Sequence, residues 1–379
     1  MKKLFLAIGV VTLLWSCTTT TDGYTISGNL RGEVEDSTKV FLRKLDDANQ
    51  PIEVDTAYTS NGVFELTGTA TGPELHYLFV DKNRGYTAII IENGDINFNA
   101  HIDSLGLATI KGTPQNDIFG DYLEASRELS QQARNIQEDI KAVQTSTEVG
   151  KEARIMALRD EMGELEEEYK TFEIDYVKSH PNGLISALLL DKAIATKALP
   201  SDEIETLYNA LSEEIKGTRP GKRVMENLDK MRTMEDAEKN TAVGSKAPDF
   251  SGPNPEGEVI ALNDVMGKAT LIDFWAAWCR PCRAENPNIV AVYNKYHDKG
   301  FNVLGVSLDR TADAWKKAIS DDGLAWNHIS NVAYFDDEIA RLYNVNAIPA
   351  AFLLDENGVI VAKNLRGPEL EREVAKLLD

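Results

Sequence analysis

Leu271-Ile272-Asp273-Phe274-Trp275 is an apolar run that is followed closely by Trp278-Cys279-Arg280-Pro281-Cys282. The run is typical of a buried strand, and Pro281 suits the first turn of a helix, where its fixed φ and missing N–H are tolerated. The sequence therefore places two thiols, Cys279 and Cys282, where a buried strand turns into a helix. This spacing indicates a redox site.

The cysteine count narrows the chemistry further. The chain has three cysteines, and Cys17 ends an apolar leader, so none remains for a structural disulfide or a zinc site built from thiolates. The histidines show neither a common spacing nor proximity to the thiol pair, and we expect surface or core imidazoles at His76, His101, His180, His297 and His328. The sequence therefore predicts a site with no metal and no other cofactor.

The amino-terminal segment predicts export and membrane attachment. Met1-Lys2-Lys3 precedes the apolar run from Leu4 to Leu14, which is short for a bilayer span and typical of an export signal. Leu14-Trp15-Ser16-Cys17 resembles a bacterial lipobox, which implies a signal peptide over residues 1–17 and a lipid on Cys17. Trp15 is bulkier than the small residue preferred there, so an ordinary cleaved signal and an uncleaved anchor stay open. We expect a membrane-anchored lipoprotein of the cell envelope that faces the periplasm.

Length and charge limit the domain count and the partners. A chain of 379 residues exceeds what one compact core usually serves, which predicts two or three domains. The formal net charge of −21 has no compensating basic stripe. This balance argues against binding to nucleic acid.

The first half of the chain predicts a β-rich domain and then a helical region. Residues 24–112 alternate in short runs separated by Asn-Gly turns, which favours an antiparallel sandwich or small barrel. Residues 116–235 have a helical period, with long helices near 116–145 and 150–179 and a break at Pro220-Gly221. Apolar positions at Leu123, Leu129 and Ile136 suit either a homodimer seam or packing within one chain.

The last region, residues 242–379, alternates strand and helix signals after a polar linker near 235–247. Strands are expected at 271–275, 301–308, 351–355 and 359–362, and helices near Pro281, at 312–321 and from Pro368. This order is that of a thioredoxin fold with an αβ insertion. The fold class is therefore multidomain, with an all-β sandwich-like domain, a central helical segment and an α/β thioredoxin fold.

Three separate motifs make residues 242–379 resemble the TlpA/ResA family of extracytoplasmic thiol-disulfide oxidoreductases. They are Asp273 to Cys282, Arg283-Ala284-Glu285-Asn286-Pro287, and Ile348-Pro349. The β-rich region similarly resembles a domain of unknown function that precedes thioredoxin-like domains in bacterial lipoproteins. The resemblance implies a protein disulfide reductase that takes electrons from a membrane thiol donor and acts on disulfides, including those of apocytochromes c.

The spacing of the two cysteines suggests a division of labour. At the mouth of the helix, free N–H groups and the helix dipole stabilise a thiolate on Cys279, which we expect to be open to solvent. Cys282 lies one turn later, reaches the same sulfur and resolves the mixed disulfide. Arg280 adds positive charge, which favours the thiolate and pulls toward oxidant behaviour, against the direction that the resemblance implies.

Two acidic residues are candidates for proton transfer. Cys282 is expected to be buried, so a nearby base would help its ionisation. Asp273 matches the buried acid of thioredoxins, although a strand-end acid bonded to backbone is an alternative. Glu285 matches a family glutamate near the thiols, although a charge on the open face of the helix is an equal alternative.

The residues expected to contact substrate surround the thiols. Pro349 matches the cis-proline of the fold, which faces the two sulfurs and leaves the backbone of Ile348 free to pair with an extended substrate. An ordinary trans proline that opens the next strand is the alternative. Trp278, Arg280 and Pro281 complete this expected surface.

Three other functions stay open. Ala247-Pro248-Asp249-Phe250 also looks like the entry to a peroxiredoxin, so a thiol peroxidase is one alternative. A non-enzymatic envelope binding protein with a thioredoxin-like scaffold is another. A disulfide isomerase would require a dimer that presents two sites across a cleft.

Overall fold

The computed structural model describes residues 22–46, 48–147 and 149–379. The expected signal peptide and its lipid-attachment residue, Cys17, lie outside the described residues. The chain forms two compact units that meet in the sequence between Leu228 and Asp229, inside helix α7 (Arg219–Asn240). The expected boundaries at 24–112, 116–235 and 242–379 stay predictions.

The β-rich part of the first unit consists of two four-stranded sheets, in the orders β4-β1-β7-β8 and β3-β2-β5-β6. Alternate residues of most of these strands, such as Ile26 and Leu30 of β1, enter one apolar core. One pairing differs from the expected antiparallel pattern, because β1 and β7 are parallel, and the strands between them supply the crossover that a parallel pair requires. The bounds are β1 Tyr24–Arg31, β2 Lys39–Leu45, β3 Pro51–Tyr58, β4 Val63–Gly68, β5 Glu74–Val80, β6 Tyr86–Ile91, β7 Gly94–His101 and β8 Thr109–Lys111.

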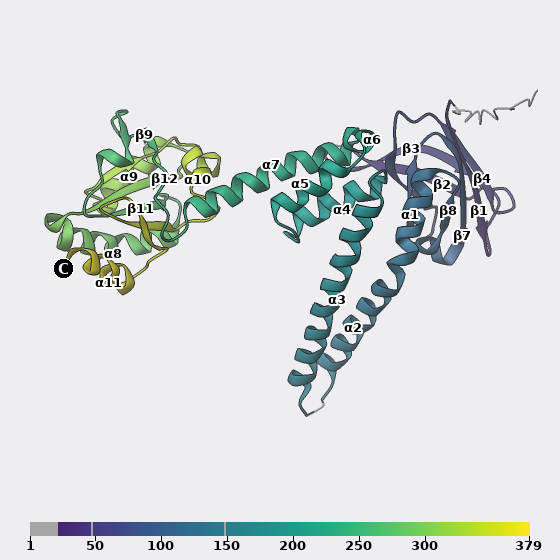
Figure 1. Ribbon diagram of the computed structural model, residues 1–379, viewed down its shortest axis with the longest axis horizontal. Coiled ribbons are helices and arrows are strands. Elements are labelled where there is room, and N and C mark those ends of the chain that lie inside the picture. The colour runs from purple at the N-terminus through teal and green to yellow at the C-terminus, as the bar shows by residue number, and fades with distance from the viewer. Residues whose placement is uncertain (1–21, 47, 148) are drawn as a thin grey trace, which may run out of the picture. The chain divides into compact units, whose positions relative to one another are not determined.

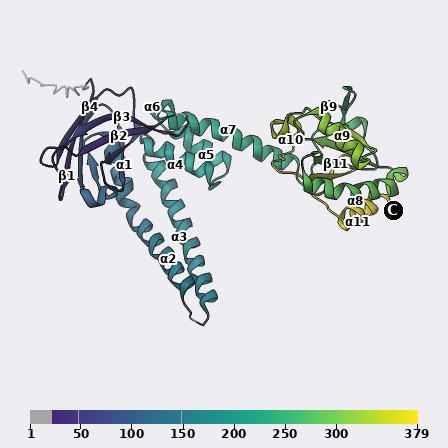
Figure 2. The same ribbon diagram turned by 180° about the vertical axis from the view of Figure 1, so that it is seen from behind.

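Two of the helices that follow form an antiparallel hairpin, α2 and α3, which both views show side by side (Figures 1 and 2). Leu129 and Ile136 of the suggested dimer seam pack inside this hairpin against Leu158 and Leu165, whereas Leu123 is 40% exposed. Packing within one chain therefore accounts for two of the three seam positions. The helices are α1 Pro114–Ala125, α2 Arg127–Thr145, α3 Lys151–Ser179, α4 Leu184–Ala195, α5 Ser201–Ala210, α6 Glu213–Gly217 and α7.

Three boundaries in this region differ from the expectation. The helix expected over 116–145 is divided at Ser126, whose hydroxyl donates to the carbonyl of Leu123 and so competes with the backbone pattern. Pro220 does not break a helix but lies in the first turn of α7, where a missing N–H is tolerated. The linker expected from 235 is helical as far as Asn240.

The second unit has a five-stranded sheet in the order β13-β12-β11-β14-β15, with a separate hairpin of β9 and β10. The central strand, β11, is buried at all seven residues, with Leu271 and Trp275 in one apolar cluster and Ile272 and Phe274 in the other. The first cluster includes residues of α8, α9 and α11, and the second includes α10. The bounds are β9 Ser251–Pro253, β10 Val259–Ala261, β11 Ala269–Trp275, β12 Phe301–Ser307, β13 Asn327–Ile329, β14 Ala350–Asp355, β15 Ile360–Lys363, α8 Arg280–Tyr296, α9 Ala312–Asp322, α10 Glu338–Leu342 and α11 Pro368–Leu378.

This arrangement confirms the predicted fold class: β-rich, then helical, then thioredoxin-like. Within the described ranges, no helix combines the length and the apolar character that a bilayer span demands. The described residues also contain no group of three or more His, Cys, Asp or Glu side chains placed to hold a metal ion.

Candidate active site

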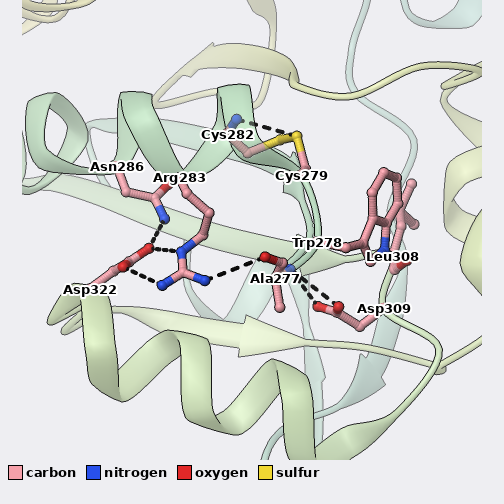
Figure 3. Close-up of a disulfide and its surroundings, with 9 residues drawn as sticks. All are labelled: Ala277, Trp278, Cys279, Cys282, Arg283, Asn286, Leu308, Asp309 and Asp322. Carbon is pink, nitrogen blue, oxygen red and sulfur yellow. Dashed lines mark hydrogen bonds and ion pairs between the residues drawn. A yellow bond between two sulfur atoms is a disulfide. The ribbon is translucent and has the colours of Figure 1, made fainter.

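The two thiols of the predicted redox site are joined at the start of α8 (Figure 3). The Cys279–Cys282 disulfide has a Cα–Cα distance of 5.3 Å, and Cys279 is the N-cap residue whose Sγ accepts the backbone N–H of Cys282 at 3.2 Å. An N–H group and the positive end of the helix dipole therefore face this sulfur, and both favour a thiolate once the bond is reduced.

Cys279 is less open to solvent than the sequence suggested. In the disulfide form it is 3% exposed and Cys282 is 2% exposed. The reason is that Cys279 belongs to the apolar cluster that contains Trp275 and Ala276, against which Ile348 also packs. A substrate sulfur must therefore approach through the small exposed part of Cys279.

The turn between β11 and α8 is held from both sides at Ala277, as Figure 3 shows. The N–H of Ala277 donates to both carboxylate oxygens of Asp309, at 3.1 and 3.0 Å, and Nη1 of Arg283 donates to its carbonyl at 3.4 Å. Asp309 is 1% exposed and also accepts the hydroxyl of Ser307 at 2.8 Å. These contacts hold the peptide two residues before Cys279 in one position.

Arg283 is itself held by an ion pair with Asp322 at the end of α9. Its Nη2 lies 2.6 Å from Oδ1 of Asp322, its Nε pairs with Oδ2, and Asn286 donates to that same Oδ2 at 2.6 Å. No local sequence pattern predicted a role for Asp309 or Asp322. The position of Asp309 offered a signal, because it follows β12, and the carboxyl ends of parallel neighbours such as β11 and β12 lie at one edge of a sheet.

Asp273 lies in β11 on the face shared with Leu271 and Trp275, the face covered by α8. It is 4% exposed, and burial raises the pKa of its carboxyl to about 7, against the opposing charge of Arg366 and with the help of Glu285. A carboxyl with this pKa can accept a proton near neutral pH and return it.

The side chain of Glu285 is held by two hydrogen bonds. Its Oε1 accepts the backbone N–H of Gly367 at 2.8 Å and the side-chain amide of Asn288 at 2.7 Å. Since Gly367 is the N-cap residue of α11, Glu285 joins α8 to the start of α11. Its charge nevertheless helps to raise the pKa of Asp273.

The remaining predicted site residues lie in the first turn of α8, in the turn before it and directly before β14. The Ile348–Pro349 peptide bond is cis, as expected, and the next residue, Ala350, pairs with Phe274 near the end of β11. Arg280 and Pro281 are exposed in the first turn of α8. Trp278 is 47% exposed, and its indole N–H donates to the carbonyl of Leu308 at 3.2 Å (Figure 3).

Two protein families match parts of this chain, in the same order as its β-rich and thioredoxin-like parts. Residues 243–363 match the AhpC/TSA family, and residues 24–119 match a domain of unknown function (DUF4369). The thiol-disulfide oxidoreductase ResA of Bacillus thuringiensis subsp. konkukian is 29% identical over 141 residues, which cover 37% of this chain and 79% of the relative. ResA of Bacillus cereus (strain ZK / E33L) is 33% identical over 121 residues, or 32% of this chain and 68% of the relative.

A solved structure also resembles part of the chain. The thioredoxin domain of a thiol-disulfide oxidoreductase from Bacteroides vulgatus is 40% identical and covers 36% of this chain and 99% of its own, with a TM-score of 0.35.

Proposed function

This chain belongs to the ResA-like family of thiol-disulfide oxidoreductases, and on that premise we propose that it reduces disulfide bonds of substrate proteins with the Cys279–Cys282 pair. The observation that carries the proposal is the position of the disulfide: Cys279 caps α8, and Cys282 follows within bonding distance. A pair placed in this way can alternate between dithiol and disulfide without rearrangement of the fold.

The proposed reaction transfers two electrons from the dithiol to the substrate. The Cys279 thiolate attacks one sulfur of the substrate disulfide, which breaks the substrate S–S bond, forms a mixed disulfide and releases the other substrate sulfur as a thiolate that takes up a proton. Cys282 then loses its proton and attacks Sγ of Cys279, which releases the second substrate thiol and forms the Cys279–Cys282 disulfide.

Asp273 is the proposed acceptor of the Cys282 proton. Cys282 is buried, which raises the free-energy cost of ionising it, and Asp273 lies in the strand beneath α8 with a pKa of about 7. Arg280, Pro281, Ile348 and Pro349 are the proposed contacts for the substrate backbone.

The setting that we propose for this reaction is the cell envelope. In this hypothesis a lipid on Cys17 anchors the chain to a membrane on the periplasmic side, and a membrane thiol protein returns the pair to the dithiol. Apocytochromes c are then one class of candidate substrate. Labelled palmitate that is incorporated into the full chain but not into Cys17→Ala would support the anchor, and equal labelling of both would contradict it.

Trapping of the mixed disulfide tests the assignment of the two cysteines. In Cys282→Ala the second step cannot occur, so Cys279 should retain substrate proteins in adducts that dithiothreitol releases. Cys279→Ala is the matched control and should retain none. Adducts that form with Cys279→Ala but not with Cys282→Ala would reverse the two roles.

The match to the AhpC/TSA family favours one second candidate, a thiol peroxidase of the peroxiredoxin type. In that reaction hydrogen peroxide would oxidise the Cys279 thiolate to a sulfenic acid. Cys282 would then condense with the sulfenic acid to form the disulfide and water. Peroxide consumption by the reduced protein that outpaces its reduction of a protein disulfide would favour this candidate over the reductase.

A further inference from the structure

Two aromatic rings, those of Tyr334 and Phe335, lie close to Trp278, the residue before Cys279. The ring centroid of Trp278 lies 5.3 Å from that of Tyr334 and 6.2 Å from that of Phe335, and the last two rings are 4.7 Å apart. The guanidinium carbon of Arg310 lies 4.0 Å from the centroid of Tyr334. We call these four residues, Trp278, Arg310, Tyr334 and Phe335, the aromatic platform.

The segment that carries Tyr334 and Phe335, residues 330–337, is held in place by buried polar groups. The hydroxyl of Ser330 donates to the carbonyl of Ser307 at 2.8 Å and accepts the N–H of Val332 at 3.1 Å. Asp337, which is 1% exposed, caps α10 and accepts the side-chain amide of Asn331 at 3.0 Å. Both ends of the segment are therefore fixed to the body of the domain.

This segment and Trp278 are attached to neighbouring residues of one strand end. Ser330 bonds to the carbonyl of Ser307, and the indole of Trp278 bonds to the carbonyl of Leu308. The end of β12 therefore sets the position of the platform relative to the Cys279 turn, which Asp309 holds from the same strand end.

Two residues of this segment have a backbone conformation that residues other than glycine seldom adopt. Val332 and Tyr334 have φ values of +57° and +55°, in the left-handed region that side chains with a Cβ disfavour. For a β-branched residue such as Val332 this conformation is unusual. Strain of this kind persists where surrounding contacts determine it, and it is concentrated at ligand-binding surfaces.

The charge of the platform indicates which chemical groups it can bind. Arg310 is exposed and forms no ion pair within the described part of the chain, and Arg280, exposed beside Cys279, forms none there either. The chain as a whole carries a formal net charge of −21. Two exposed arginines therefore offer positive charge to a substrate: Arg280, which follows Cys279 in the chain, and Arg310, which lies on the ring of Tyr334. Asp336, exposed beside Phe335 in the chain, is the opposing charge of this segment. Charges farther away than about 8 Å are largely screened at physiological salt.

We propose that the aromatic platform binds the segment of an oxidised protein that flanks its target cysteine, and that it selects segments with a carboxylate beside an apolar side chain. The carboxylate pairs with Arg310, which the ring of Tyr334 holds in place, and the apolar side chain lies on Trp278 and Phe335. The proposal rests on the proposed disulfide exchange at Cys279 and adds to it the substrate class.

Two synthetic disulfide peptides test the charge preference. They are identical except for the residue before the cysteine, which is Glu in one and Lys in the other. The reduced full-length protein is mixed with excess peptide. Samples are quenched with an alkylating reagent at successive times to measure how much Cys279–Cys282 disulfide has formed. The measured quantity is the ratio of the second-order rate constants, Glu peptide over Lys peptide.

We expect a ratio of about three for the wild type, which is the effect of an exposed ion pair. Arg310→Glu should lower the ratio to less than one. Arg341→Glu is the matched control: it reverses an exposed arginine on α10, outside the platform, and should keep the wild-type ratio. A second pair of peptides carries Leu or Ser at the position next to the varied residue. Tyr334→Ala should reduce the ratio of the rate constants, Leu peptide over Ser peptide.

The outcomes separate this proposal from the proposed function. If the wild type fails to reduce bis(2-hydroxyethyl) disulfide, a small neutral substrate, the exchange at Cys279 fails and the docking proposal fails with it. If that reaction proceeds but the Glu to Lys ratio is the same in the wild type, Arg310→Glu and Arg341→Glu, only the docking proposal is overturned. It is also overturned if Arg310→Glu leaves the ratio unchanged and converts a dimer to a monomer in sedimentation, because the platform would then bind a second copy of the chain.

Discussion

At the scale of single residues, Asp273 couples the site to the stability of the domain. Its pKa of about 7 in the folded protein, against an ordinary value of about 3.9, means that folding keeps the carboxyl protonated where the unfolded chain would ionise it. Between about pH 4 and pH 7 the unfolded state therefore binds fewer protons than the native state, so the free energy of unfolding falls as the pH rises through this window. The same feature that suits proton transfer thus destabilises the fold at neutral pH.

Replacement of Asp273 by Asn should remove this pH dependence. We expect the free energies of unfolding of Asp273→Asn and wild type to be similar near pH 4 and to differ by on the order of 3–4 kcal/mol at pH 8, with the variant more stable. Urea unfolding of the oxidised proteins, followed by tryptophan fluorescence, measures the difference. Asp298→Asn, at an exposed position, is the control and should follow the wild type. A constant difference between pH 5 and pH 8 would contradict the raised pKa.

A second prediction concerns Asp309, which we infer to be a positioning residue because it acts on Cys279 through the Ala277 peptide. Asp309→Ala leaves the N–H of Ala277 without its acceptor and should cost about 1–3 kcal/mol of stability. It should also slow the attack of reduced Cys279 on a small disulfide. Asp309→Asn keeps one acceptor oxygen and should restore most of the attack rate. If Asp309→Ala loses stability but attacks the small disulfide at the wild-type rate, the role of Asp309 is structural only.

At the scale of elements, the α2–α3 hairpin depends on a small core of its own. Four buried residues, Leu129, Ile136, Leu158 and Leu165, hold it together. Leu158→Ala should cost about 2–5 kcal/mol, because Leu158 is 1% exposed and its removal leaves a cavity. Met156→Ala, at a position 62% exposed in the same helix, is the control and should change the stability little. Comparable losses for the two variants, measured by urea unfolding under circular dichroism, would contradict the assigned packing.

The helices and strands also show which features a local sequence pattern could predict. The strand at 271–275, the helix that starts at the CxxC motif and the hairpin at 356–358 were predictable, because an apolar run, a proline in the first helical turn and turn residues are local signals. The break at Ser126 and the course of α7 through Pro220 and beyond Glu235 were not. A helical period continues across Ser126, and proline is tolerated in a first turn as readily as it ends a helix, so the local sequence admits both outcomes.

At the scale of the whole molecule, the two compact units should unfold separately. Trp275, Trp278, Trp315 and Trp326 all belong to the unit that starts at Asp229, and the first unit has no tryptophan among its described residues. Tryptophan fluorescence therefore reports on the second unit, and far-ultraviolet circular dichroism reports on both. We expect Leu158→Ala to shift a transition seen by circular dichroism and to leave the fluorescence transition within error. A shift of both by the same amount would show that the chain unfolds as one cooperative unit.

The amino-acid sequence was enough to place the proposed redox pair and to predict the class of fold around it, and the cis bond before Pro349 was implied by the resemblance to the TlpA/ResA family. The position of the pair follows from short-range rules, in which a buried strand, two cysteines three residues apart and a proline in the first helical turn define a thiol at a helix start. The contacts of Asp309 with Ala277 and of Asp322 with Arg283 join residues 32 and 39 positions apart. The contacts that bring Arg310, Tyr334 and Phe335 close to Trp278 likewise join residues far apart in the sequence. Only the tertiary structure decided these, because they depend on which strand ends lie together and how the segment after β13 folds back, and no local pattern of residues carries that information.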